Sequence, residues 1–252
     1  MSFAQDHSYL GSGIILIRPW QSTQPMVEVG NCSAFQVSPQ TNEITLPDYK
    51  NPGGGIQNKV DRISDWQLSY TFHDFNEANF ARATRGKAST ITAGTVTEEP
   101  AIAHKGAYVP LARIAATVTA VAAAGGGTAY EPGDDYLVDR GMLYIPATSS
   151  IPSAINGTPN IEVTYTHGEL GHVEAAVQAA QFYEMEFRGS NEARSGKIVR
   201  LVAHKVSGGV ISELGLLGEE YGAGEVNGSI TADPSKRTTA DHSQYFYWQQ
   251  EK

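Results

Sequence analysis

The stretch Asp65-Trp66-Gln67-Leu68-Ser69-Tyr70-Thr71-Phe72 alternates strictly between apolar and polar side chains. Successive side chains of an extended strand point to opposite faces. Trp66, Leu68, Tyr70 and Phe72 therefore share one face, and the residues between them share the other. The pattern predicts a strand with one face in a core and one face in water, so a β-sheet is the expected basis of the fold.

A short helix is predicted directly after this strand, over residues 76–85. Asp74 or Asn76 can cap its start, because their side-chain oxygens accept from unpaired backbone N–H groups of the first turn. Arg82 suits the negative C-terminal end of the helix. Gly86 is expected to supply the left-handed residue that ends it.

The rest of the chain reads as short strands separated by turns. Alternating apolar or β-branched residues, bounded by Gly, Pro, Asn and Asp, are typical of strands and hairpins. The predicted strands cover residues 13–17, 26–37, 115–124, 136–138, 142–145, 161–166, 183–187, 197–206, 211–217, 225–231 and 244–248.

Composition supports the same fold class. The chain has 252 residues, only 18% of them charged, with 26 Gly, 12 Pro and 12 Tyr, which favours a turn-rich, mainly β protein. The formal net charge of −9 argues against a protein that coats DNA, since such a protein needs a basic face. The single cysteine, Cys32, excludes an internal disulfide framework and a Cys-based zinc site, and its apolar strand context predicts a small core residue.

No membrane or export segment is expected. The apolar run Ile14–Ile17 near the start has four residues, whereas a membrane helix needs roughly 18. The first residues lack the basic and apolar regions of a signal peptide. We therefore expect the protein to be made and folded in a cytoplasm.

Motifs for metal, phosphate or nucleophile chemistry do not match their required spacings. The run Gly125-Gly126-Gly127-Thr128 has no following Lys, so it does not form a phosphate-binding loop. His167 and His172 are five residues apart and flank a glycine, which predicts loop histidines rather than metal ligands. Asp134, Asp135 and Asp139 do not fit a calcium loop, and turn formation explains the first two. We expect no metal, no cofactor and no catalytic site, which favours a binding or structural protein.

Several motifs follow one another in a fixed order along nearly the whole chain. They are Leu10-Gly11-Ser12-Gly13, Val29-Gly30-Asn31-Cys32-Ser33, the strand 66–72 with the helix 76–85, Tyr130–Asp139 with Ile161–Thr166, Phe187–Asn191, Glu219-Glu220-Tyr221 and Gly228–Asp233. In this order the chain resembles the tail tube proteins (major tail proteins) of long-tailed bacteriophages.

The resemblance implies a tail-tube-like β-sandwich or partial barrel with one short flanking α-helix. Residues 1–86 and 169–252 would form a discontinuous tail-tube domain. Residues 87–168 would form an inserted β-rich segment on the outer surface.

The resemblance also implies a function, that of a structural virion protein and not of an enzyme. Six copies would form a ring, and rings would stack into the tail tube, the conduit through which DNA is ejected into the host. Tape measure, tail terminator and tail tip proteins would be its further partners. The protein would assemble in the host cytoplasm and reside in the virion tail, and DNA would pass without specific binding.

Two sets of residues are assigned to sites in this interpretation. Members of the family carry a long hairpin loop that reaches the neighbouring ring, and the candidate here consists of Pro47, Asp48, Tyr49, Lys50, Asn51, Pro52, Gly53, Gly54 and Gly55. Glu184 and Glu186 share the polar face of a predicted strand, and they either line the lumen, where acidic groups would repel DNA, or are ordinary solvated residues.

Two other classes of function stay open. The first is a non-enzymatic carbohydrate-binding or adhesive β-sandwich, in which Tyr and Trp side chains stack on sugars. Trp66 and Tyr70 argue against it, because they are expected in the core. The second is a β-rich hydrolase with paired carboxylates at Glu98-Glu99 or Asp134-Asp135. Adjacent carboxylates on a strand point to opposite faces, so neither pair can act together on a regular strand.

Overall fold

The computed structural model describes residues 8–252, which divide into two compact units. Of the described residues, one unit comprises residues 8–88 and Val173–Lys252, and we call it the sandwich unit. The other, the inserted unit, comprises Ser89–His172. The boundaries predicted from the sequence lie between residues 86 and 87 and between residues 168 and 169. The chain passes between the units through β5 (Lys87–Ile91) and β12 (Leu170–Glu174), which pair as a two-stranded sheet.

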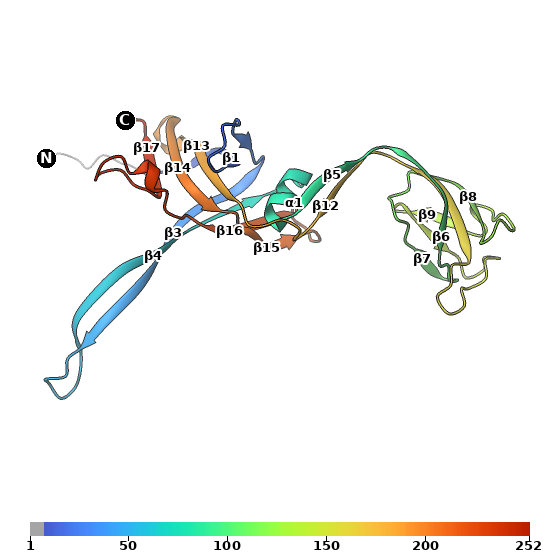
Figure 1. Cartoon of the computed structure of the whole chain (residues 1–252), viewed down its shortest axis with the longest axis horizontal. Helices are drawn as coiled ribbons and strands as arrows, with labels where there is room; N and C mark the ends of the chain where they lie inside the picture. Colours follow the sequence, from blue (N-terminus) through green and yellow to red (C-terminus); the bar gives the residue numbers. More distant parts are fainter. Residues whose placement is uncertain (1–7) are drawn as a thin grey trace. The chain divides into compact units, whose positions relative to one another are not determined.

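The sandwich unit contains two antiparallel sheets, which confirms the predicted mainly β fold. One sheet has the order β17-β14-β13-β1-β2, and Figure 1 labels β17, β14, β13 and β1 side by side. The other has the order β15-β16-β4-β3. The strands are β1 (Gly11–Pro19), β2 (Val27–Glu28), β3 (Cys32–Pro47), β4 (Ile56–Phe72), β13 (Phe182–Asn191), β14 (Lys197–Ser207), β15 (Val210–Gly215), β16 (Ala223–Ser229) and β17 (Phe246–Gln250).

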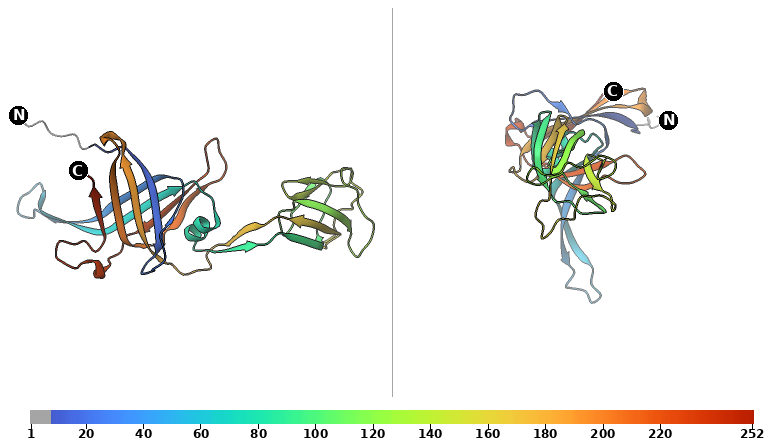
Figure 2. Two further views of the ribbon diagram at one scale, coloured as in Figure 1. Left: turned by 90° about the horizontal axis from the view of Figure 1, so that it is seen from above. Right: turned by 90° about the vertical axis from the view of Figure 1, so that its right-hand side faces the viewer.

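The core of this unit lies between the two sheets. The first sheet contributes Ile15, Ile17 and Met185, and the second contributes Leu68 and Phe72, all at most 2% exposed. The predicted alternation in β4 is therefore correct, since every second residue from Leu68 to Phe72 is buried. Strands of one sheet cross over those of the other in the left view of Figure 2.

Helix α1 (Glu77–Thr84) follows β4, as predicted. Asn76 is its N-cap and accepts from the Asn79 N–H at 2.9 Å. Asp74 has a different role: its carboxylate accepts from the Asn31 N–H at 2.9 Å. The predicted left-handed stop at Gly86 is wrong, because the left-handed residue is Arg85, with φ of 51°.

The predicted continuous strand over residues 26–37 is also wrong. The chain breaks after β2, at Gly30, where φ is +101°. A Cβ at this position would overlap the Asp74 carboxylate, so glycine allows the close approach that lets Asp74 bind Asn31. β3 begins only at Cys32, and it continues ten residues beyond the predicted end at Val37, to Pro47.

The inserted unit has its own sheets and its own core (green and yellow in Figure 2). Its sheets have the orders β7-β10-β9 and β6-β11-β8. The core includes Leu143, Ile145, Ile161, Val163 and Tyr165, each 0% exposed. The strands are β6 (Gly94–Ala101), β7 (Ala107–Val109), β8 (Thr117–Ala123), β9 (Leu137–Asp139), β10 (Met142–Ile145) and β11 (Ile161–His167).

Candidate self-assembly surface

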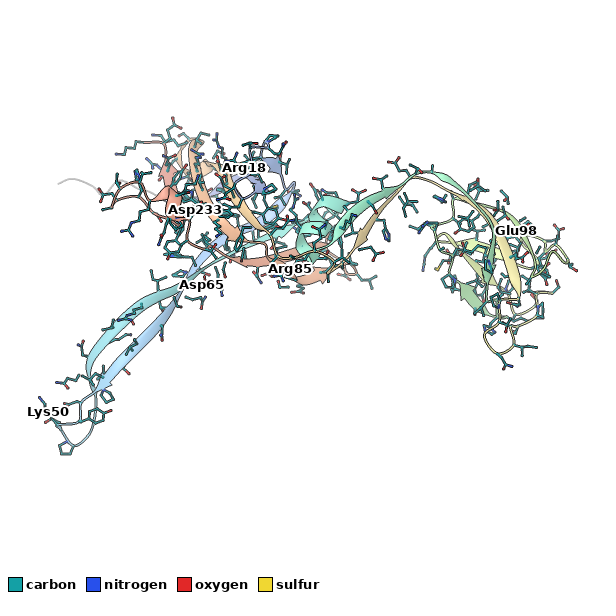
Figure 3. The ribbon with its side chains drawn as sticks, in the orientation of Figure 1. Arg18, Lys50, Asp65, Arg85, Glu98 and Asp233 are labelled. Carbon is teal, nitrogen blue, oxygen red and sulfur yellow. The ribbon has the colours of Figure 1, made fainter. Side chains whose placement is uncertain are left out.

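The largest surface feature of the sandwich unit is a long two-stranded hairpin. β16 pairs with β4 only over Gln67–Phe72, whereas β3 follows β4 along its whole length. Residues 40–65 therefore have no strand neighbour other than each other, and we call them the arm. Figure 1 shows β3 and β4 running on together beyond the sheet, and Figure 3 labels Asp65 at the base of the arm and Lys50 at its tip.

One face of the arm is apolar and uncovered. Ile44 lies directly opposite Val60, and Leu46 is two residues further along β3, on the same face. The exposed fractions of Ile44, Leu46 and Val60 are 49%, 49% and 46%. Large aliphatic side chains on an isolated hairpin gain nothing from folding unless another surface covers them.

The apolar residues of the arm are on the face opposite to the one that covers the core. Along β3, the odd-numbered Phe35 and Val37 pack against the core, whereas the even-numbered Ile44 and Leu46 are apolar in the arm. Side chains alternate with a period of two, so the arm turns its apolar residues away from its own sandwich. The apolar face is thus not an extension of the core.

The other face of the arm carries charges that satisfy one another. Lys59 binds Glu43 at 2.7 Å and lies 3.6 Å from Asp61. The hydrogen bond from Lys59 to Glu43 raises the pKa of the ammonium group. Ile63 is the exception on this face, opposite Thr41 near the base of the arm.

The predicted loop Pro47–Gly55 forms the tip of the arm. Pro47 is the last residue of β3, and residues 48–55 make the connection. The Asp48 N–H donates to the Gly55 carbonyl at 2.8 Å, and the Asp48 carboxylate accepts from Lys50 and Asn51. These bonds lower the pKa of Asp48. The tip is therefore locally ordered by hydrogen bonds, with Tyr49 82% exposed.

A second apolar surface lies where β1 of one sheet faces β3 of the other, and we call it the β1–β3 groove. Ile15, Phe187, Leu201 and Trp248 form one row across the first sheet, each directly opposite the next. Phe35 of β3 stacks on Phe187 with ring centroids 5.6 Å apart. The full lining consists of Tyr9, Gly11, Ser12, Gly13, Ile15, Cys32, Ser33, Ala34, Phe35, Val37, Phe187, Leu201 and Trp248. Cys32, expected as a core residue, is only partly buried here.

Glu184 and Glu186 share one face of β13, as predicted, but both are ion-paired. Glu184 accepts two hydrogen bonds from Arg18, at 2.9 and 2.7 Å. Glu186, 4% exposed, accepts from Arg200 at 2.9 and 2.8 Å and also from Arg188. Burial alone would raise the pKa of Glu186, but the hydrogen bonds and charges of the two arginines together lower it. This face therefore presents paired charges, three arginines to two glutamates, rather than free carboxylates.

The carboxylate pairs of the hydrolase alternative have structural contacts. Glu99 accepts from the Tyr165 hydroxyl at 2.6 Å and from the Ala112 N–H at 2.8 Å. Burial is the main cause that raises the pKa of Tyr165 to about 12. Asp135 accepts from the backbone of Glu131 and Ser150. Within residues 8–252, no three His, Cys, Asp or Glu side chains come together as a metal site, and no helix is long and apolar enough to cross a membrane.

Aromatic side chains of two kinds bear on the sugar-binding alternative, buried ones in the sandwich unit and exposed ones in the inserted unit. Trp66 and Tyr70 belong to the core, as predicted, and Trp66 packs edge-on against Phe246 at 4.9 Å. In the inserted unit, however, Tyr108 lies opposite Tyr144 with ring centroids 5.0 Å apart. Tyr108 is 51% exposed, and its hydroxyl donates to Asp139 at 2.8 Å.

The residues that distinguish this surface were not identified from the sequence. Ile44, Leu46 and Val60 lie between the predicted strands. The run Ile44-Thr45-Leu46 alternates, which is the signal that could have indicated a strand here. No curated protein matches the chain. A family model matches residues 8–249, so the chain belongs to the family described as "Protein of unknown function UCP028589".

Proposed function

We propose that this protein is a structural protein that assembles with copies of itself into stacked hexameric rings, forming the tail tube of a long-tailed bacteriophage. The observation that carries the proposal is the arm, which holds Ile44, Leu46 and Val60 in water on a face turned away from its own core. An arm of this kind is stabilised when a second copy covers it. In a tube, it would reach from one ring to the next.

Unpaired strand edges support self-assembly around a ring. The outermost strands of the two sheets are β17 and β2 in one, and β15 and β3 in the other. Each outer strand has backbone N–H and C=O groups that a neighbouring strand can pair with. Contacts between unlike edges close into a ring when the rotation between copies is right, and unlike faces stack rings into a filament.

In this proposal the sheet face that carries Glu184 and Glu186 lines the channel for DNA. Arginine side chains held by carboxylates release fewer counterions on meeting phosphate than free arginines do, so they bind DNA weakly. The paired charges of Arg18, Glu184, Glu186 and Arg200 would let DNA slide. Tape measure, terminator and tip proteins would be the other partners, and the virion tail the location.

The proposal is tested by placing a charge on either face of the arm. Ile44→Asp puts a carboxylate on the apolar face, and Thr45→Asp puts the same group on the opposite face, beside Lys59. Both positions are exposed, so each change should alter the free energy of unfolding by less than about 0.5 kcal/mol. Negative-stain images and sedimentation of the concentrated wild-type protein and of Thr45→Asp should show rings or rods. Ile44→Asp should stay monomeric with an unchanged melting temperature.

A wild-type protein that remains monomeric at the highest attainable concentration would contradict the proposal. The second candidate function, a carbohydrate-binding or adhesive module, would then gain weight if the monomer bound to a glycan array. The specific observation in its favour is the exposed Tyr108–Tyr144 pair of the inserted unit, because neighbouring aromatic rings can stack on sugars.

A further inference from the structure

We propose that the arm of one copy docks, apolar face down, in the β1–β3 groove of a second copy. This inference rests on the proposed self-assembly and specifies which two surfaces meet. It joins the two uncovered apolar surfaces described above, the face around Ile44, Leu46 and Val60 and the groove floored by Phe35, Phe187 and Trp248.

The groove has the shape and bonding groups that an extended strand needs. Within the described residues, β3 has a strand partner on one edge only, and β1 pairs on its β2 side only at Leu16 and Ile17. The groove therefore runs between two partly unpaired strand edges, and at Gly11 and Gly13 the missing side chains let Tyr9 and Phe187 pack close to the backbone of β1. Extended strands commonly bind such edges. Backbone hydrogen bonds supply the affinity, and pockets bind every second side chain of the added strand.

The charges of the two surfaces are compatible with close contact. Among residues 8–252, no Asp, Glu, Lys or Arg lines the groove. On the arm, Glu43, Lys59 and Asp61 pair with one another on the face that stays outside. Docking therefore removes no ion pair from water, which would be costly. The apolar face also carries Arg62, opposite Asn42, so the arm brings a positive charge to a contact between copies with a net charge of −9.

The arm cannot occupy the groove of its own chain. Val37 lines the groove, and Ile44 follows it seven residues later along the same continuous strand. At about 3.3 Å per residue, Ile44 lies roughly 23 Å beyond the groove. The strand would have to fold back on itself to return, so the occupant is the arm of a second copy.

The single cysteine of the chain provides a direct test, because Cys32 lines the groove. In Leu46→Cys, mild oxidation of assembled protein should link the introduced thiol of one copy to Cys32 of the next. Each copy then carries two linkable thiols, so non-reducing gels should show a ladder of multimers. Leu46→Cys with Cys32→Ser can form dimers at most. Thr45→Cys, on the opposite face of the arm, should give little ladder.

A second measurement uses the wild-type protein and does not depend on a substitution in the contact. Burial raises the pKa of the Cys32 thiol to about 11, so alkylation is followed at alkaline pH, where docking should slow it in assembled protein by at least about tenfold relative to dilute protein. Ile44→Asp should abolish this protection. Rods that show neither the ladder of multimers nor the slower alkylation of Cys32 would overturn the groove as the docking site and leave the tube proposal intact. If no oligomers form at all, both proposals fail.

Discussion

At the scale of single residues, Glu186 shows how a nearly buried carboxylate is kept charged in the sandwich unit. Two arginines hold it, and Arg200 donates from Nε to one carboxylate oxygen and from Nη2 to the other. Glu186→Gln leaves Arg188 and Arg200 without their counter-charge, and because water reaches both arginines the free energy of unfolding at neutral pH should fall by only about 1 kcal/mol. Glu43→Gln in the exposed ion pair of the arm is the control, with an expected loss below about 0.5 kcal/mol.

The pH dependence of the same variant follows from the lowered pKa of Glu186. A carboxyl group whose pKa is lower in the folded state stabilises the fold above its unfolded pKa, and that contribution is lost as the pH falls through the folded pKa. The free energies of unfolding of wild type and Glu186→Gln should therefore differ most near pH 7. The difference should become smaller as the pH falls below the ordinary pKa of a carboxyl group. Urea unfolding at pH 7 and at pH 3.5 measures it, and an equal difference at both values would contradict the assignment.

Arg85 and Gly86 show how a local rule can be shifted by one position. Arg85 takes the left-handed conformation at the end of α1, whereas Gly86 is buried, and a Cβ there would lie 2.6 Å from the Glu174 carbonyl oxygen. Arg85→Gly should raise the free energy of unfolding by roughly 0.5 to 1 kcal/mol, because glycine adopts this conformation without strain. Gly86→Ala should lower it. Thermal melts of both variants check the pair, and equal effects would show that Gly86 has no packing role.

At the scale of elements, the sequence predicts those parts whose pattern is set by their own core. The alternation in 65–72 and the capping residue before α1 are local, so the strand ends and the helix begins as expected, although β4 itself begins nine residues earlier, at Ile56. The pairing of Arg18 with Glu184 joins residues 166 positions apart, and nothing near either residue indicates it. The ion pairing on this face could therefore not be predicted, although the shared face of Glu184 and Glu186 could.

The arm was missed for a different physical reason. Its two strands contain Pro39 and Pro47 and many polar residues, so the strand pattern is weak. Its apolar residues also change face relative to Phe35 and Val37, as expected when a strand stops serving its own core and begins to serve another surface. When apolar residues are covered only by a second copy, no other part of the same chain indicates that they become buried.

At the scale of the whole molecule, the two units should unfold independently, because each has its own core and only two strands, β5 and β12, carry the chain between them. Calorimetry of the full chain should show two transitions. A variant that replaces residues 92–169 by an Asn-Gly turn, which suits a two-residue hairpin, should keep one transition at an unchanged temperature. It should also still form rings or rods, since the arm and the β1–β3 groove both belong to the sandwich unit. One shared transition, or a variant that no longer folds, would show that the inserted unit is part of a single cooperative structure.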